Sequence, residues 1–229
     1  MQMSPFLIYS FCYVMVFILA WLSKKEGNHR LINDHGAITD KPGNIISFHI
    51  TGILWLGMVP AFVLKQPVLK TLTGNSLPDS SVLLMLLLLL MLTAAMAVKA
   101  GTTIQKQFAD SKHAHYQLPV TFIIRYFIIR IIFLFIYELW FRGYLLFGSV
   151  DAMGIPLAVA SNVLLHVLLH LFNSKKEMLA CIPFSLLACW LCILFNAAWP
   201  AVILHITFSL PYELNLYKSH FSTPKIARL

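Results

Sequence analysis

Glu138 and Arg142 place an acid and a base one helical turn apart in the apolar segment Tyr137–Gly143. At positions i and i+4 the two side chains share a helix face and can pair. Ionisable residues inside a long apolar segment are expensive to bury, and they indicate a functional site by default. The chemistry they suggest is a carboxylate that polarises water beside a guanidinium. The alternative is an ion pair that only locks two helices together.

Two further apolar segments carry polar residues at the same spacing. Asn162, His166 and His170 follow one another at four-residue intervals, and Ser209 follows His205 by four. This spacing projects each set from one helix face, so the three faces can converge on one polar cavity. Asn162 alone is best interpreted as a satisfied core residue. A histidine pair at i and i+4 can bind a metal or supply a base, and His205 with Ser209 can donate to an oxyanion or act as a ligand.

Composition decides what kind of chain must position these residues. Of 229 residues, 59% are hydrophobic and only 11% are charged, and the mean hydropathy is +0.78. A soluble domain carries roughly a quarter charged residues, so a soluble protein is excluded. The fold class expected is all-α, a polytopic transmembrane helix bundle.

About 20 apolar residues cross a bilayer as a helix. The sequence predicts about seven such spans, or eight if the over-long fourth is split, at residues 5–22, 45–64, 82–98, 118–149, 155–172, 178–195 and 199–216. With these boundaries His170 lies about 13 Å deeper in its span than His205 does at 1.5 Å rise per residue, an offset that a tilt or a late helix start would have to close. We expect one membrane domain, residues 1–229, with scaffold helices at 1–117 and the chemistry at 118–217.

Lysine and arginine indicate the orientation. With seven spans, most basic residues fall in loops on one side, whereas the opposite loops hold only Lys65 and Lys70. The positive-inside rule then puts the N-terminus outside and the C-terminus in the cytoplasm. Topology therefore accounts for the formal charge of +8, and no nucleic-acid partner is expected. The basic residues of the cytoplasmic side are Lys24, Lys25, Arg30, Lys41, Lys99, Lys106, Lys112, Lys175, Lys176, Lys218, Lys225 and Arg228.

Other polar residues receive simpler interpretations. His49 is expected at the membrane interface, and Arg125 and Arg130 are expected to extend toward the headgroups. His113 and His115 are expected in a solvated basic loop rather than in a metal or lipid site, because a pair without a third ligand is a weak signal.

The order of these motifs resembles the CAAX-protease and bacteriocin-processing family (CPBP, also called Abi), which includes the Rce1 prenyl endopeptidase. The family pattern is Glu-Glu-x-x-x-Arg, often ending Phe-Arg-Gly, followed by Phe-x-x-x-His and His-x-x-x-Asn on later helices. Here Tyr-Glu-Leu-Trp-Phe-Arg-Gly at 137–143, His-Val-Leu-Leu-His at 166–170 and His-Ile-Thr-Phe-Ser at 205–209 match in order. Three residues depart from the pattern: Tyr137 replaces the first glutamate, His166 the phenylalanine and Ser209 the asparagine.

The resemblance implies hydrolysis of a peptide bond within the membrane. Glu138 with His170 would activate water, His205 would stabilise the oxyanion with help from Ser209, and Arg142 would orient Glu138. Tyr137, Asn162 and His166 would be accessory.

No cofactor is required by this interpretation, although His166, His170 and His205 could form a three-histidine zinc site. The expected partners are the lipid bilayer and a peptide or protein substrate, with or without a lipid anchor, and the expected location is a bacterial inner membrane. Since tyrosine is no carboxylate base, the alternative is an inactive member that binds a peptide or confers bacteriocin self-immunity. A transporter is a third hypothesis.

Overall fold

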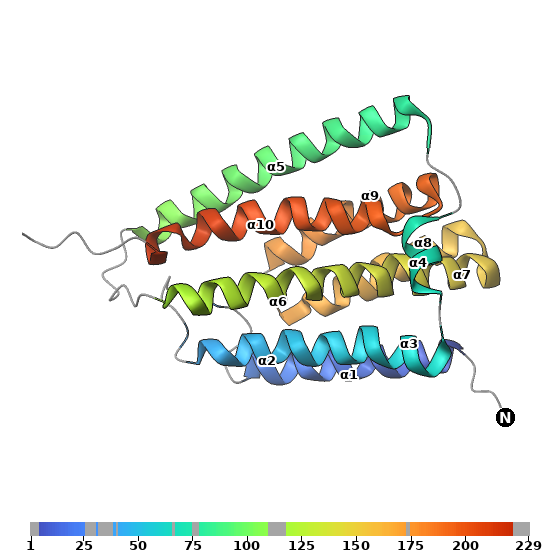
Figure 1. Cartoon of the computed structure of the whole chain (residues 1–229), viewed down its shortest axis with the longest axis horizontal. Coiled ribbons are helices and arrows are strands. Elements are labelled where there is room, and N and C mark those ends of the chain that lie inside the picture. Colours follow the sequence, from blue (N-terminus) through green and yellow to red (C-terminus); the bar gives the residue numbers. More distant parts are fainter. Residues whose placement is uncertain are drawn as a thin grey trace, which may run out of the picture.

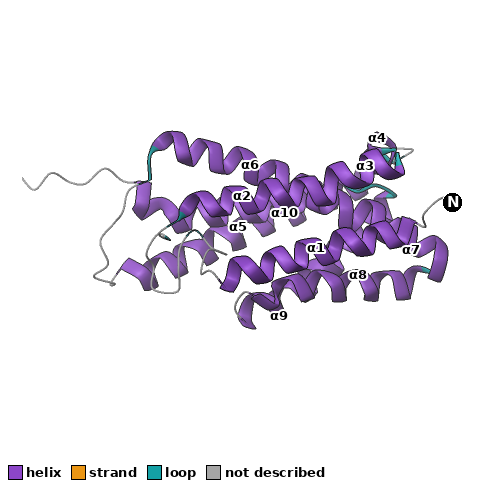
Figure 2. Ribbon diagram, turned by 90° about the horizontal axis from the view of Figure 1, so that it is seen from below, coloured by secondary structure: helices purple, strands orange, loops and turns teal. Residues whose placement is uncertain are grey.

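The computed structural model describes residues 5–25, 31, 39, 41–65, 67–74, 78–109, 118–172 and 175–221. Within these residues every regular element is a helix, and the long helices run side by side along one axis (Figures 1 and 2). The all-α bundle expected from composition is confirmed. Arg30, Lys112, His113, His115, Lys225 and Arg228 lie outside the described residues.

The helical elements follow the predicted segments closely. Their bounds are α1 Pro5–Lys25, α2 Pro42–Ile53, η1 Leu54–Met58, α3 Val59–Leu64, α4 Val68–Thr73, α5 Ser80–Ala109, α6 Val120–Glu138, η2 Leu139–Leu145, α7 Leu146–Met153, α8 Ile155–Leu169, η3 His170–Phe172, α9 Lys175–Phe195 and α10 Trp199–Phe221.

Six helical segments of the described chain are long and apolar enough to cross a membrane. The fourth is one continuous segment, Val120–Met153, so the alternative of eight spans with a split fourth one is wrong. α10, the seventh predicted span, has 23 residues and lies along the bundle with the others (Figure 1). It is less apolar than the six because its inner face carries polar residues, among them His205, Ser209 and Glu213. The protein is therefore an integral membrane protein.

Glycine and proline set the turn between the fourth and fifth segments. Gly154 has φ of 78°, a left-handed value that glycine adopts without steric cost. It ends α7 and precedes α8, where Pro156 occupies the first turn and needs no amide hydrogen there. The chain therefore reverses direction within one residue, and α7 contacts α8 directly.

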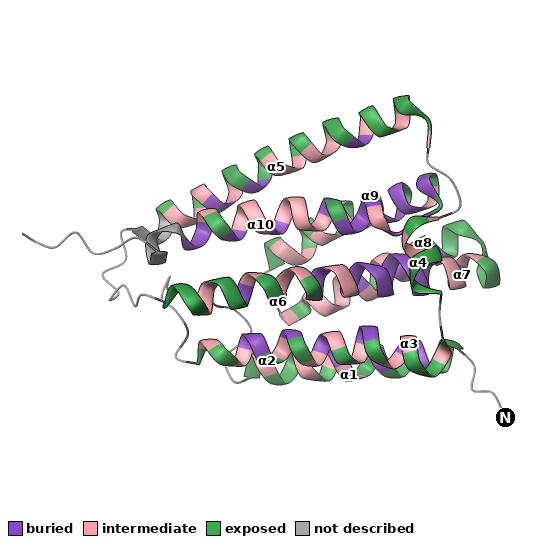
Figure 3. Ribbon diagram, in the orientation of Figure 1, coloured by how far each residue is buried: buried purple, intermediate pink, exposed green. Residues whose placement is uncertain are grey.

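Burial is concentrated around the motif at residues 137–143 (Figure 3). Every residue from Tyr137 to Leu146 is buried. In contrast, α5 exposes large apolar side chains such as Leu84, Leu88 and Met91. A helix whose leucines face outward fits contact with lipid tails, while the polar residues face the interior of the bundle.

Candidate active site

The first motif lies where α6 changes from α-helix to the π-helical segment η2. A π-helix pairs residues five apart and leaves carbonyl groups out of the regular pattern, and such segments are frequent at functional sites. In η2 the Phe141 carbonyl accepts a hydrogen bond from Asn162 Nδ2 at 2.6 Å. Cys189 Sγ in turn contacts Asn162 Oδ1 at 3.3 Å. Asn162 is thus a core residue with its hydrogen bonds satisfied, as the sequence predicted, and it joins α8 and α9 to η2.

Glu138 is fully buried, and each of its carboxylate oxygens faces a cationic or imidazole group. Oε1 lies 2.5 Å from His205 Nδ1 on α10, and Oε2 lies 3.4 Å from Arg142 Nε one turn later. A carboxylate excluded from water needs such partners because an isolated buried charge is very costly. The pairing expected between Glu138 and Arg142 is therefore present, and His205 adds a contact across helices.

Arg142 is also fully buried and has a second partner. Its Nη2 donates a hydrogen bond to Ser185 Oγ on α9 at 2.8 Å. The guanidinium therefore lies between Glu138 and Ser185 and connects η2 with α9. Gly143, the next residue, meets α4: a Cβ there would lie 2.7 Å from Thr71 Cγ2. The absence of a side chain at Gly143 therefore allows η2 and α4 to pack closely.

Two of the three histidines lie beside the Tyr137 ring, and the third lies beside His166. The ring of Tyr137 lies 5.6 Å from that of His166 and 6.0 Å from that of His205, and His166 lies 5.1 Å from His170. His166 is buried, whereas His170 is partly exposed. Tyr137 and His166 are therefore in contact with each other. Both are residues at which the sequence departs from the CPBP motif pattern.

The expected difference in depth between His170 and His205 does not keep His170 out of the cluster, since its ring lies 5.1 Å from that of His166. Figure 1 shows the turn between α7 and α8 extending farther along the bundle than the turn before α10. α8 therefore begins farther out, and fifteen residues later His170 is at the level of the cluster, within electrostatic range of Glu138 and His205. Ser209 is buried one turn after His205, on the side of α10 that carries His205.

Several buried polar atoms of this cluster lack a hydrogen-bond partner within the described protein. They are Tyr137 Oη, Arg142 Nη1 and both ring nitrogens of His166. Glu138 Oε2 and Arg142 Nε also form no hydrogen bond, but they face each other as an ion pair at 3.4 Å. Buried polar atoms are almost always hydrogen-bonded, and each one left without a partner costs about 1–3 kcal/mol. The cluster is therefore suited to bind polar atoms that come from outside the chain, such as water or a peptide group.

The three-histidine zinc site does not fit this geometry. In the described part of the chain no group of three His, Cys, Asp or Glu residues is arranged to hold a metal ion. No step of the reaction below is therefore assigned to a metal, and a reaction without a cofactor stays a prediction.

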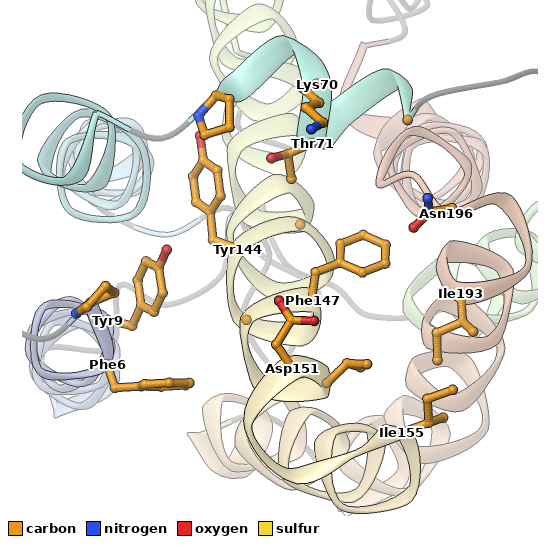
Figure 4. A pocket seen from close by; sticks show the side chains of 16 residues that line it. Phe6, Tyr9, Lys70, Thr71, Tyr144, Phe147, Asp151, Ile155, Ile193 and Asn196 are labelled. Carbon is orange, nitrogen blue, oxygen red and sulfur yellow. The ribbon is translucent and has the colours of Figure 1, made fainter.

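A cavity of the described structure lies away from this cluster, at the end of the bundle that carries α4 (Figure 4). Its volume is about 710 Å³. Figure 4 shows Tyr9 from α1, Lys70 from α4 and Asp151 from α7 around it. Gly143 reaches its wall, but none of Glu138 and the three histidines lines it. The cavity and the candidate site are therefore separate features.

Together the fold and the cluster define a polytopic membrane protein with a buried glutamate held by arginine and histidine. Residues 114–210 match the family model of type II CAAX prenyl endopeptidase Rce1-like proteins. The resemblance to the CPBP and Rce1-like family is thereby confirmed over the part of the chain that contains all three motifs. No curated protein and no solved structure matches the chain.

A second buried polar cluster was missed by the sequence interpretation. Arg130 does not extend to the headgroups: its Nε lies 3.0 Å from Glu213 Oε1 on α10. His49 is not interfacial but buried, and its Nε2 lies 3.3 Å from Arg130 Nη1. Tyr126 donates to Glu213 Oε2 at 3.0 Å. The sequence did contain a signal for this cluster, because Glu213 is an acidic residue four positions after Ser209 and therefore on the same face of the helix.

The N-terminal helix also supports the site rather than only filling space. Tyr13 of α1 donates a hydrogen bond to the Leu165 carbonyl of α8 at 2.9 Å. Its ring stacks on Trp140 at 6.2 Å and meets Phe141 edge to face at 6.5 Å. α1 therefore fixes α8 and η2 relative to each other, a role that its apolar sequence with two tyrosines does not reveal.

Proposed function

We propose that the protein is an intramembrane peptidase that hydrolyses a peptide bond of a membrane-associated peptide or protein tail. The observation that supports this most is the buried Glu138 carboxylate, held by Arg142 and His205 and surrounded by polar atoms without partners. A carboxylate kept in place and shielded from bulk water can act as a general base on a single bound water. The matched family is named for an endopeptidase, which supports the same class of reaction.

The reaction assigns one role to each group. Glu138, with His170 nearby, takes a proton from a water molecule, and the hydroxide adds to the carbonyl carbon of the substrate. His205 in its imidazolium form donates from Nδ1 to Glu138 and from Nε2 to the oxyanion, with Ser209 as a second donor. Arg142 holds Glu138 in place. The tetrahedral intermediate then collapses, the C–N bond breaks, and the proton taken by Glu138 passes to the leaving amine.

Tyr137 favours a second function. Phenol has a reference pKa of about 10 and cannot replace the carboxylate that the family pattern has at this position. A protein that kept the fold and the polar cluster but lost hydrolysis would bind a peptide without cleaving it, as in bacteriocin self-immunity.

An experiment with purified protein in nanodiscs distinguishes the two functions. The protein is incubated with a defined pool of membrane-anchored peptides, half of them lipidated and half not, and the products are analysed by mass spectrometry. A peptidase cleaves members of the pool, and Glu138→Ala and His170→Ala abolish cleavage while the protein remains folded. Asp79→Ala, which removes an exposed carboxylate just before α5, is the control and retains cleavage. Peptide binding without cleavage supports the immunity function, and unchanged turnover in both site variants contradicts the assigned roles.

For orientation we propose the N-terminus outside and the C-terminus in the cytoplasm of a bacterial inner membrane. The described lysines support this: seven lie at the end of the bundle where α1 ends and α9 begins, and Lys65 and Lys70 lie at the other end (Figure 1). Positive charge accumulates on the cytoplasmic side. Reporter fusions at each terminus test the proposal, and a cytoplasmic signal from the N-terminal fusion would contradict it. The seven lysines are Lys24, Lys25, Lys41, Lys99, Lys106, Lys175 and Lys176.

A further inference from the structure

The second polar cluster joins the same two helices as the Glu138–His205 contact. We call Arg130, Tyr126 and Glu213 the α6–α10 clamp. Both carboxylate oxygens of Glu213 are occupied, Oε1 by Arg130 Nε and Oε2 by the Tyr126 hydroxyl, each at 3.0 Å. Glu213 is buried and Arg130 is only partly exposed. Because both oxygens are held from α6, the clamp fixes the position of α10 along α6 as well as its distance.

The clamp and the catalytic contact lie in matching register. Glu138 follows Arg130 by eight residues on α6, and His205 precedes Glu213 by eight residues on α10. The two helices run in opposite directions (Figure 1). At 1.5 Å per residue both separations are about 12 Å, so the two contacts can be satisfied together only at one register of α10 against α6. A shift of one residue at the clamp would move His205 away from Glu138.

α10 needs such a constraint because its own backbone is interrupted. Pro211 lies inside the helix between His205 and Glu213. Proline has no amide hydrogen, so the Thr207 carbonyl one turn earlier loses its helical hydrogen bond, and a helix bends most easily at such a place. The backbone therefore does not by itself fix how the two halves of α10 lie against α6. On the other side of α10, Gly101 of α5 approaches so closely that a Cβ there would lie 2.5 Å from the Tyr212 carbonyl oxygen, which leaves α10 little room to move away from α6.

We propose that Arg130 and Glu213 are positioning residues that set the register at which His205 meets Glu138. The role of this contact in hydrolysis rests on the proposed function, but the positioning itself does not. Neither clamp residue touches the Glu138 carboxylate. Apart from the charge of Arg130, which lies within electrostatic range of His170, they act on the reaction through the placement of α10.

The first test needs no substrate. In protein labelled with ¹⁵N-histidine in nanodiscs, the His205 resonances are identified by their loss in His205→Gln. Glu138→Gln gives the resonances of His205 without its carboxylate partner. We expect Glu213→Gln and Arg130→Gln to move the His205 resonances toward that reference, although neither position contacts His205. Arg125→Ala, which removes an exposed arginine of the same helix, is the control and leaves them in place.

Milder changes keep the proposal testable if the glutamine variants do not fold. Arg130→Lys keeps a cation opposite Glu213, and Glu213→Asp draws the carboxylate back by one methylene. We expect a smaller displacement of the His205 resonances in both. Unchanged His205 resonances in every folded clamp variant would overturn the proposal, because the register would then be set elsewhere.

The second test uses cleavage of a peptide substrate. Misplacement of a catalytic group by about 1 Å can cost about 10²-fold in rate, so kcat should fall by up to that factor in Glu213→Gln while KM stays the same. Arg130→Lys should recover a large part of the loss that Arg130→Gln causes. The double variant should lose no more than the worse single variant, because both break one contact. Losses that multiply in the double variant would contradict a shared role.

The two proposals fail in different ways. If the wild-type protein cleaves no peptide but its His205 resonances still move in the clamp variants, hydrolysis is wrong and the positioning stands. If Glu138→Ala abolishes cleavage but the clamp variants change neither kcat nor the His205 resonances, hydrolysis stands and the positioning is wrong.

Discussion

Glu138→Gln separates the contribution of Glu138 to stability from its contribution to catalysis. Glutamine has nearly the shape of glutamate but no charge, so it leaves the fully buried Arg142 guanidinium with neutral side-chain partners such as Ser185, at 2.8 Å. Removing one partner of a buried ion pair costs about 3–5 kcal/mol. For a protein of this size that lowers the melting temperature by about 6–20 °C. Loss of the general base lowers the cleavage rate by about 10²–10⁴-fold.

A second substitution removes the unpaired charge without restoring the base. In Glu138→Gln with Arg142→Met, methionine fills the volume of the arginine stem and leaves no buried cation. Replacement of a buried ion pair by groups without charge is often close to neutral, so we expect stability within about 2 kcal/mol of the wild type. Peptide cleavage should remain lost.

Thermal unfolding in nanodiscs and peptide cleavage on the same preparations measure both effects. If Glu138→Gln melts like the wild-type protein, Arg142 does not depend on Glu138 for its charge compensation, and our account of the buried pair is wrong. If the double variant recovers cleavage together with stability, Glu138 acts only through the fold.

The site and its packing make two further predictions. Gly143→Ala should cost about 1–3 kcal/mol, because the new methyl group would meet Thr71 of α4 at 2.7 Å; Gly148→Ala, with nothing within 4 Å, is the matched control, and equal melting temperatures would contradict the close packing. Tyr137→Phe should leave the free energy of unfolding unchanged or raise it, because the buried hydroxyl has no partner within the described protein. A more than tenfold fall in kcat for Tyr137→Phe would show that the hydroxyl takes part in the reaction.

The sequence determined the spans because the length of an apolar segment and the proline or glycine residues that end it are local properties. The fifth span was predicted at 155–172, and α8 with η3 occupies the same residues. Spacing also identified Glu138, Arg142 and the histidines as inward-facing, since four-residue intervals fix a helix face whatever lies opposite it. The lysines at the helix ends indicated an orientation because their distribution between loops can also be counted in the sequence.

Only the tertiary structure decided which faces meet. Arg130 resembled a headgroup-seeking arginine near the start of a helix, and the pairing with Glu213 depends on where α10 lies against α6. The depth of His170 depends on how far the turn between α7 and α8 extends, which no local pattern records. The π-helical turn at Leu139–Leu145 is equally hidden in the sequence, and its polar partners Asn162 and Ser185 lie on other helices. Contacts between distant segments depend on the shape and register of whole helices, and the sequence states only the face that each helix presents.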